Sequence, residues 1–152
     1  MERPKAVVDA SVVAKWFLEE EHSENARRLR DAFATDRLVL SAPSVLLYET
    51  LNALWASGLF DEDELALASR SLCKYGFDLW EPAEGVLERS ARISYGKGIT
   101  VYDSSYVALA RHLGTVLFTA DEELVRKFPD VAKHIGRMEE AVEDGLDGTR
   151  YP

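Results

Sequence analysis

The sequence predicts an α/β protein with three layers, in which helices cover both faces of a central parallel sheet of about four to five strands. Two observations lead to this prediction. Short apolar runs alternate along the chain with helical patterns of about ten to fifteen residues, which is the arrangement of βαβ units. The 152 residues are 47% apolar and contain no linker-like tract, so we expect one domain spanning residues 1–152.

The predicted strands are short runs rich in branched apolar residues. The first run ends at Asp9, and the run 115–119 is the clearest of the set. Strands are predicted at 6–8, 38–40, 77–80, 115–119 and within 131–138. The segment 99–102 is also strand-like, and the acidic, glycine-containing tail at 139–152 is expected to be loosely ordered.

The predicted helices are delimited by recognisable start and stop signals. Asp61 and Glu64 have the spacing of a capping box, and Gly76 stops the helix that they open. Pro82 suits the first turn of another helix, and Gly114 ends a third. Helices are predicted from about Val12 and at 23–33, 44–57, 61–76, 82–95, 104–113 and 122–128.

Charge and composition exclude several classes of protein. The chain has 18 lysines and arginines against 27 acids, a net charge of −9, which argues against a nucleic-acid binder that relies on a basic patch. Its single cysteine, Cys73, cannot form an internal disulfide. No apolar stretch approaches the roughly 20 residues of a membrane span, and no signal peptide precedes the first strand. We therefore expect a cytoplasmic location and no membrane partner.

Four acids stand almost alone in stretches that otherwise lack charge. Glu49 is the one charged residue in the range 38–60, and Asp103 is the one in the range 98–110. Burying an ionised carboxylate costs several kcal/mol unless a partner or a metal compensates it. Each of these acids therefore needs an explanation. The four are Asp9, Glu49, Asp103 and Asp121.

The predicted helix at 44–57 is apolar on both faces apart from Glu49 and Asn52. We therefore expect this helix to be enclosed on most sides, with Glu49 pointing into the protein or into a cleft. The ordinary alternatives are a long-range salt bridge or a surface position for Glu49, and a buried amide bonded to the backbone for Asn52.

The three aspartates each precede a predicted helix, so capping alone is the ordinary explanation for any one of them. Together they have a further property. Asp9 and Asp121 end strands, Asp103 follows the strand-like 99–102, and parallel sheets bind ligands outside the carboxyl ends of their strands. Carboxylates gathered at one edge repel each other, and a divalent cation is the most direct compensation.

The remaining residues narrow the chemistry of such a site. The histidines His22, His112 and His134 show no paired spacing, and one cysteine cannot make a zinc site, so Mg²⁺ or Mn²⁺ suits the all-oxygen set. No dinucleotide-binding glycine motif, phosphate loop or serine nucleophile elbow is present. Nucleotide cofactors and acyl transfer are therefore disfavoured.

Four segments carry a family resemblance: Val7–Val12, Leu46–Leu54, Tyr102–Ala110 and Phe118–Asp121. In order and separation they resemble the PIN-domain ribonucleases, and among these the VapC-type toxins of prokaryotic toxin–antitoxin pairs. The block around Asp103 is the most specific of the four. The resemblance spans about residues 6 to 130 and implies the PIN fold for a single domain.

The resemblance implies that Asp9, Glu49, Asp103 and Asp121 form the catalytic acidic site. Asp9 and Asp103 correspond to the principal Mg²⁺ ligands of the family. Glu49 and Asp121 correspond to acids that complete the pocket or hold a second ion through water.

Three polar residues are candidates for a supporting role. Ser11 and Thr119 stand where the family has small hydroxyl residues that orient the carboxylates, although helix capping is the ordinary explanation for both. Asn52 shares a helix face with Glu49 and is a further candidate. The family pattern does not specify a role for Glu122 or Glu123.

The resemblance further implies an endoribonuclease that uses Mg²⁺, with Mn²⁺ as a substitute, to activate water and cut RNA, leaving a 5′ phosphate and a 3′ hydroxyl. A cognate antitoxin protein would hold the enzyme inactive by occupying the acidic groove. A homodimer is expected by the same analogy. Four apolar residues suit either its interface or the core: Leu59, Phe60, Leu65 and Leu67.

Two other functions remain open from the residues. A non-catalytic module could use the acidic pocket to bind a basic peptide, which the net charge favours. An aspartyl phosphatase or phosphotransferase is less favoured, because Ser11 stands where those enzymes place a second aspartate.

Basic residues at Lys15 and in the cluster Arg27, Arg28 and Arg30 are candidates for phosphate or partner contact, with a merely solvated helix face as the more ordinary explanation.

Overall fold

A computed structural model of the chain describes residues 3–139. The predicted loose tail at 139–152 therefore lies, from residue 140 onward, outside the described residues. A five-stranded parallel sheet forms the centre of the molecule, with the strand order β3-β2-β1-β4-β5. The strands are β1 (Lys5–Val8), β2 (Val39–Pro43), β3 (Asp78–Trp80), β4 (Leu117–Thr119) and β5 (Ala132–His134). The α/β prediction is confirmed.

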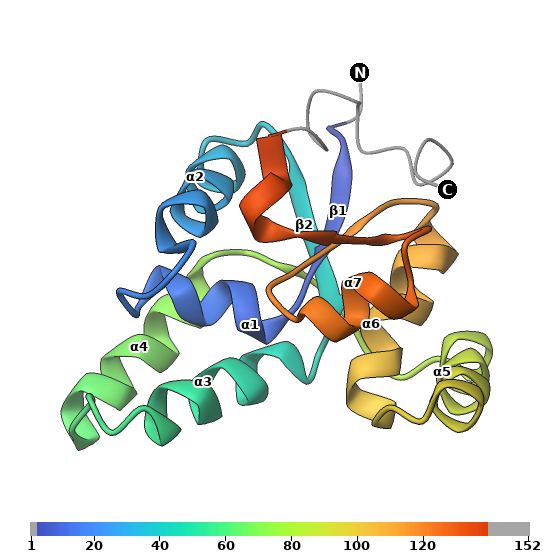
Figure 1. Cartoon of the computed structure of the whole chain (residues 1–152). Coiled ribbons are helices and arrows are strands. Elements are labelled where there is room, and N and C mark those ends of the chain that lie inside the picture. Colours follow the sequence, from blue (N-terminus) through green and yellow to red (C-terminus); the bar gives the residue numbers. More distant parts are fainter. Residues whose placement is uncertain (1–2, 140–152) are drawn as a thin grey trace.

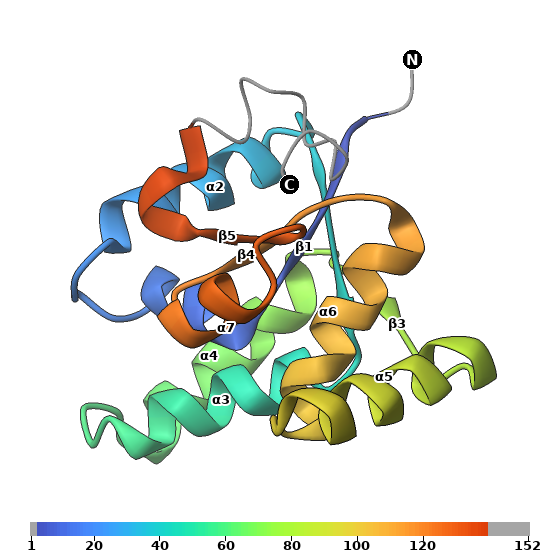
Figure 2. The same ribbon diagram turned by 45° about the vertical axis from the view of Figure 1, so that its right-hand side comes forward.

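Helices cover both faces of this sheet, with α1 and α2 on one side and α5 and α6 on the other (Figures 1 and 2). Helices α3 and α4 pack against each other beyond the carboxyl ends of the strands (Figure 1). The α-helices are α1 (Ala10–Val13), α2 (Ser23–Ala34), α3 (Leu46–Ala56), α4 (Glu62–Lys74), α5 (Glu84–Lys97), α6 (Val101–Leu113) and α7 (Glu122–Lys127). Two short 3₁₀ segments are η1 (Ala14–Trp16) and η2 (Ile135–Arg137).

The two central strands form the most deeply buried part of the core. Every residue of β4 is buried, and only Lys5 of β1 is exposed. Continuous apolar runs are what a parallel strand needs when helices cover both faces. In the parallel pairing of β1 with β4, Val8 lies opposite Phe118. The segments that follow the two strands therefore leave the sheet at the same edge. The acids that follow β1 and β4 are thereby brought to one place.

Local capping signals explain most helix boundaries. Asp61 and Glu64 form the predicted capping box at the start of α4, with each side chain bonded to the other residue's backbone N–H. Gly114 takes a left-handed conformation and ends α6 as predicted. Pro82 precedes α5, for which Ala83 is the N-cap, so its predicted place in the first turn is wrong.

The strand-like assignment of residues 99–102 is also wrong. Helix α6 begins at Val101, and its N-cap is Thr100, whose hydroxyl accepts a hydrogen bond from the Asp103 N–H at 3.1 Å. Asp103 therefore lies in the first turn and does not cap the helix. The branched residues favour a strand here, whereas the Thr100 hydroxyl favours the start of a helix. The hydroxyl prevails because it satisfies a backbone N–H that the first turn of a helix leaves unpaired.

The predicted enclosure of α3 is wrong as well. Tyr48 is 79% exposed, Trp55 is 66% exposed, and Asn52 between them is exposed rather than buried. With Leu51, these residues line a groove between α3 and α4. Helix α3 lies at the end of the sheet and not across its face, so only one of its sides meets the core (Figure 1).

The apolar residues considered for an interface divide into two pairs. Leu59 and Leu67 are 73% and 62% exposed. Phe60 and Leu65 are partly buried against a small second core around Leu54. Among the described residues, no helix is long and apolar enough to cross a membrane.

Candidate metal-binding acidic site

Asp9 is fixed where β1 passes into α1. Its carboxylate caps α1, because Oδ1 accepts hydrogen bonds from the Ser11 N–H at 3.1 Å and from the Ser11 hydroxyl at 2.5 Å. Only 6% of Asp9 is exposed. Burial raises the pKa of Asp9 to about 6, against the opposing effect of hydrogen bonds from Ser11 and Thr119. Capping, the ordinary explanation for Asp9, therefore holds, and it does not remove the cost of burying the charge.

Ser11 and Thr119 connect the ends of β1 and β4. The Ser11 hydroxyl oxygen accepts the Ala120 N–H at 2.9 Å and lies 3.5 Å from the Thr119 hydroxyl. The Thr119 hydroxyl in turn accepts the Asp121 N–H at 3.0 Å. These two hydroxyls join the backbone that carries Asp9 to the backbone that carries Asp121, in keeping with a supporting role.

Asp121 is held by the helix that it starts. Its Oδ1 accepts the Glu123 N–H at 2.9 Å and the Leu124 N–H at 3.4 Å, so it caps α7. Glu123, for which the family pattern specifies no role, lies near enough to Asp103 to raise the pKa of that carboxyl. Glu123 is itself paired with Lys127 at 2.8 Å, which lowers the pKa of Glu123.

Glu49 is half-buried on α3 and receives a hydrogen bond from another helix. The Tyr106 hydroxyl donates to Glu49 Oε1 at 2.5 Å. Burial and repulsion from Asp103 raise the pKa of Glu49, and the hydrogen bond from Tyr106 opposes them. Sequence reasoning gave Tyr106 no role. The available signal was its position three residues after Asp103, on the same side of α6.

Asp103 is the acid that interacts with all the others. Burial raises the pKa of Asp103 first, and repulsion from Asp121 raises it further. Asp103 in turn raises the pKa values of Asp9 and Glu49. The structure thus brings the four predicted acids into mutual electrostatic range at the carboxyl edge of the sheet. Among the ion pairs of residues 3–139, none involves any of the four.

The spacing of the acids bears on the kind of cation that they fit. Within the described part of the chain, no three histidine, cysteine, aspartate or glutamate side chains are grouped tightly enough to hold one ion. A closed all-protein cage of the kind used by Ca²⁺ or structural Zn²⁺ is therefore not what these residues form. Mg²⁺ commonly keeps several waters and uses one or two carboxylates plus substrate phosphate. An open cluster of oxygen donors fits that ion.

Several other predicted residues lie apart from the cluster. Asn52 is exposed in the groove between α3 and α4. Lys15 is buried and paired with Glu20 at 3.0 Å. The arginine cluster on α2 is paired with acids of its own surroundings, in contacts of Arg27 with Glu19, Arg28 with Glu24 and Glu139, and Arg30 with Asp31. Pairing with nearby acids is thus the simpler account of these basic residues.

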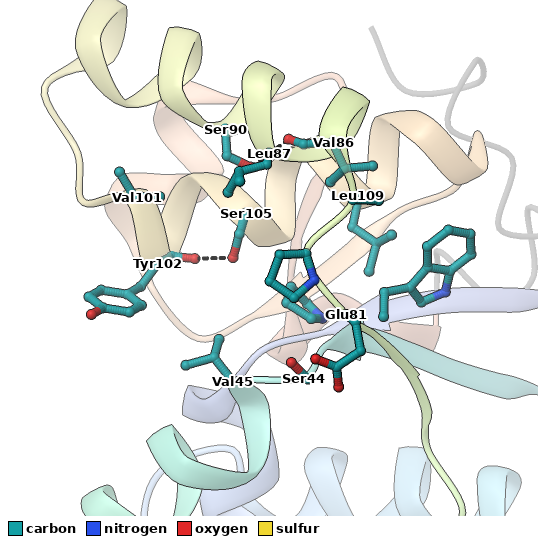
Figure 3. A pocket seen from close by; sticks show the side chains of 14 residues that line it. Ser44, Val45, Glu81, Val86, Leu87, Ser90, Val101, Tyr102, Ser105 and Leu109 are labelled. Carbon is teal, nitrogen blue, oxygen red and sulfur yellow. Dashed lines mark hydrogen bonds between the residues drawn. The ribbon is translucent and has the colours of Figure 1, made fainter.

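An apolar cavity lies between the start of α3 and helices α5 and α6 (Figure 3). Its volume is about 190 Å³. Val45, Tyr102 and Leu109 are among its lining residues, and Glu81 supplies its one carboxylate. None of the four acids is among its lining residues, so the cavity is separate from the acidic cluster.

Comparison with known proteins gives a consistent result. The sequence signature of the PIN domain matches residues 6–132. Ribonuclease VapC3 of Pyrobaculum aerophilum is 38% identical over 131 residues, which cover 82% of this chain and 95% of that protein. The crystal structure of PAE2754, also from Pyrobaculum aerophilum, has a TM-score of 0.68 and 26% identity, covering 93% of this chain and 90% of that one.

A more distant likeness concerns the fold alone. The toxin–antitoxin complex from Klebsiella pneumoniae contains a chain that matches with a TM-score of 0.57 at 14% identity. The match covers 84% of this chain and 96% of that one.

Proposed function

Because the chain belongs to the PIN-domain family, we propose that it is a VapC-type endoribonuclease that depends on a divalent cation, Mg²⁺ with Mn²⁺ as a substitute. We place it as the toxin of a toxin–antitoxin pair that acts in the cytoplasm. One PIN-like domain spanning the chain would carry this activity. The 38% identity with a protein named ribonuclease VapC3, over nearly the whole of that relative, supports the reaction class.

The observation that carries the proposal is the position of Asp103 among three other acids that have no basic partner in residues 3–139. Ionised carboxylates that are partly buried and within electrostatic range of one another are unfavourable in the metal-free protein, because burial and repulsion both oppose ionisation. Fold stability alone does not require such an arrangement. A bound cation compensates it directly.

Asp9 and Asp103 would be the principal ligands of this cation, with Glu49 and Asp121 beside them. When bound, the ion supplies a Lewis acid for the phosphate and lowers the pKa of a water molecule near neutral pH. The chain's own contribution is positioning. Ser11 fixes Asp9 through two hydrogen bonds, and the hydroxyl link to the end of β4 keeps the Asp9 and Asp121 backbones in register.

An antitoxin is the proposed protein partner. Residues 38–69 contain no lysine or arginine, while Glu49 and the run from Asp61 to Glu64 contribute acids. A basic segment would complement this surface and the uncompensated acids of the site. The solved toxin–antitoxin complex of similar fold is in keeping with such a pairing.

A homodimer is the second proposed assembly. Leu59 and Leu67 are exposed, and apolar side chains on α5 and α6 are exposed as well, with Tyr95 at 94%. Large contiguous patches of exposed apolar side chains are typical of interfaces, and these residues are the candidates for such a patch. Light scattering on the purified chain, which measures its mass in solution, would distinguish a dimer from a monomer.

The test of the proposed function is cleavage of a mixed RNA panel by the purified chain, with and without Mg²⁺, followed by mapping of the product ends. We expect Mg²⁺-dependent internal cleavage that leaves 5′ phosphates. The variants Asp9→Asn and Asp103→Asn should fold normally and lose cleavage. Cleavage that survives both EDTA and the Asp103→Asn change would exclude the mechanism.

A thermal melt separates the enzyme from the binding module considered above. A ligand that binds only the folded state raises the midpoint of unfolding. The nuclease should therefore melt at a higher temperature in Mg²⁺ or Mn²⁺. An unchanged midpoint together with inactive protein would favour a module that binds a basic peptide. The phosphatase alternative predicts release of phosphate from a small phosphate ester without RNA cleavage.

A further inference from the structure

Tyr106 is a buried polar residue that lies at the centre of the acidic cluster. It belongs to α6, three residues after Asp103, and only 1% of it is exposed. Its ring is part of the main core, and α6 packs against β1 and β2. A phenol placed this deeply needs a hydrogen-bond partner for its hydroxyl. That partner is Glu49, 57 residues away on α3.

The direction of this hydrogen bond is set by chemistry. An ionised carboxylate has no proton to give, whereas a tyrosine hydroxyl is protonated at neutral pH, so Tyr106 donates and Glu49 accepts. The distance from the hydroxyl to Glu49 Oε1 is 2.5 Å, in the short range of charge-assisted O–H···O⁻ bonds. This hydrogen bond uses one carboxylate oxygen, and the other accepts no hydrogen bond from residues 3–139.

The hydrogen bond also compensates for what α3 lacks. The backbone donors that hold Asp9 and Asp121 come from the helices that those residues start. Glu49 lies inside α3, where the backbone N–H groups are already used by the helix. Within residues 3–139, the Tyr106 hydroxyl makes the one hydrogen bond that reaches the Glu49 carboxylate, and no ion pair reaches it.

We propose that Tyr106 is a positioning residue: its hydroxyl holds the Glu49 carboxylate in the orientation that serves a divalent cation at the acidic cluster. The inference rests on the proposed function for the presence of that cation. A glutamate side chain has several freely rotating bonds, so an unrestrained Glu49 would lose conformational entropy on binding the ion. A hydrogen bond to a rigid, core-packed ring removes that freedom beforehand.

The test is a titration of the RNA-free full-length chain with Mn²⁺, followed by electron paramagnetic resonance, which measures free ion directly. The variant Tyr106→Phe removes one oxygen atom and keeps the ring in the core. We expect it to bind Mn²⁺ about 10- to 100-fold more weakly, as is typical when a residue that orients a metal ligand is removed.

A matched control separates positioning from packing. Tyr75 is a partly buried tyrosine whose ring packs against Trp16 at a centroid distance of 4.9 Å, in a different part of the core. Tyr75→Phe should leave the Mn²⁺ affinity unchanged. An equal loss of affinity in both phenylalanine variants would attribute the effect to general loosening of the core and overturn the proposal.

A double-mutant comparison tests whether Tyr106 acts through Glu49. If it does, Glu49→Gln with Tyr106→Phe should bind Mn²⁺ no more weakly than Glu49→Gln alone. Two independent losses that add would overturn the proposal, as would an unchanged affinity of Tyr106→Phe beside a weakened Glu49→Gln.

Two further outcomes are distinguishable. If the wild-type chain binds no Mn²⁺, or Asp103→Asn binds it equally well, the proposed function itself is overturned. If Tyr106→Phe does not fold, Glu49→Asp removes the same hydrogen bond by shortening the acid and leaves the core intact. An unchanged Mn²⁺ affinity of Glu49→Asp would then overturn the positioning role, and a loss of affinity would support it.

Discussion

The acidic cluster consists of two halves that are built in different ways. Asp9 and Asp121 each follow a central strand and cap the helix that comes next, so their carboxylates are tied to backbone N–H groups two or three residues away. Glu49 and Asp103 lie within helices α3 and α6, and neither is the N-cap of its helix. The first pair is positioned by its own segment of chain, and the second depends on how distant helices pack together.

This difference separates two contributions of an acid, namely stability of the fold and affinity for a cation. A capping acid contributes to both, because its loss also leaves backbone donors unpaired. An acid inside a helix contributes mainly to the charge of the site. Variants of the two pairs should therefore have opposite effects on the metal-free protein.

The largest expected effect is on catalysis. Asp103→Asn should lower Mg²⁺-dependent RNA cleavage by about 100-fold or more, since removing one preorganised electrostatic group commonly costs that much. The rate is measured on a substrate chosen from the RNA panel. Glu88→Gln is the control, because Glu88 pairs with Arg92 on the exposed side of α5. Full activity in Asp103→Asn would contradict a central role for this acid.

The next effect concerns Mg²⁺ and the stability of the fold. At a concentration of 100 times the dissociation constant, Mg²⁺ should stabilise the wild-type chain by about 2.7 kcal/mol against unfolding. Asp103→Asn should lose most of this stabilisation. The measurement is urea denaturation with and without the ion. Equal stabilisation of both chains would mean that the ion binds elsewhere.

Loss of the Ser11 hydroxyl, which links the ends of β1 and β4, should destabilise the metal-free protein. Ser11→Ala removes the hydroxyl that accepts the Ala120 N–H and donates to Asp9, so the free energy of unfolding should fall by about 1 to 3 kcal/mol. Ser69→Ala is the control, since its hydroxyl only bonds a carbonyl of its own helix. Equal destabilisation by both changes would show that the link is unimportant.

The capping role of Asp121 can be separated from its charge. Asp121→Ala should destabilise the metal-free chain by about 1 kcal/mol, because the N–H groups of Glu123 and Leu124 lose their acceptor. Asp121→Asn keeps an acceptor and should cost much less. Urea denaturation in metal-free buffer measures both. A larger loss with asparagine than with alanine would refute the capping role.

The smallest effect is a pH dependence from the other half of the cluster. The raised pKa values of Glu49 and Asp103, with that of Asp9 near 6, mean that these three groups bind more protons in the folded than in the unfolded chain between about pH 4 and pH 6. This contribution to stability is therefore lost as the pH rises through that window. In metal-free buffer, Asp103→Asn should melt slightly higher than the wild type at pH 7 and not at pH 4. A difference that is independent of pH would contradict the repulsion.

Much of this organisation could be predicted from the sequence. The alternation of apolar runs and helical patterns predicted the α/β class, and the capping box at Asp61 and the glycine stop at Gly114 were confirmed. Asp9 and Asp121 could be placed at the carboxyl edge of the sheet because a strand end and a helix cap are both local features.

Other features were decided only by the tertiary structure. The hydroxyl of Thr100, and not Asp103, caps α6. The side of α3 that carries Asn52 is exposed, and its apolar residues alone did not distinguish it from a buried side. The partner of Glu49 was beyond prediction, because Tyr106 meets it only when α3 and α6 converge at the end of the sheet. Hydrogen bonds between neighbours in sequence follow from local residue order, whereas contacts between distant helices depend on packing that local patterns do not encode.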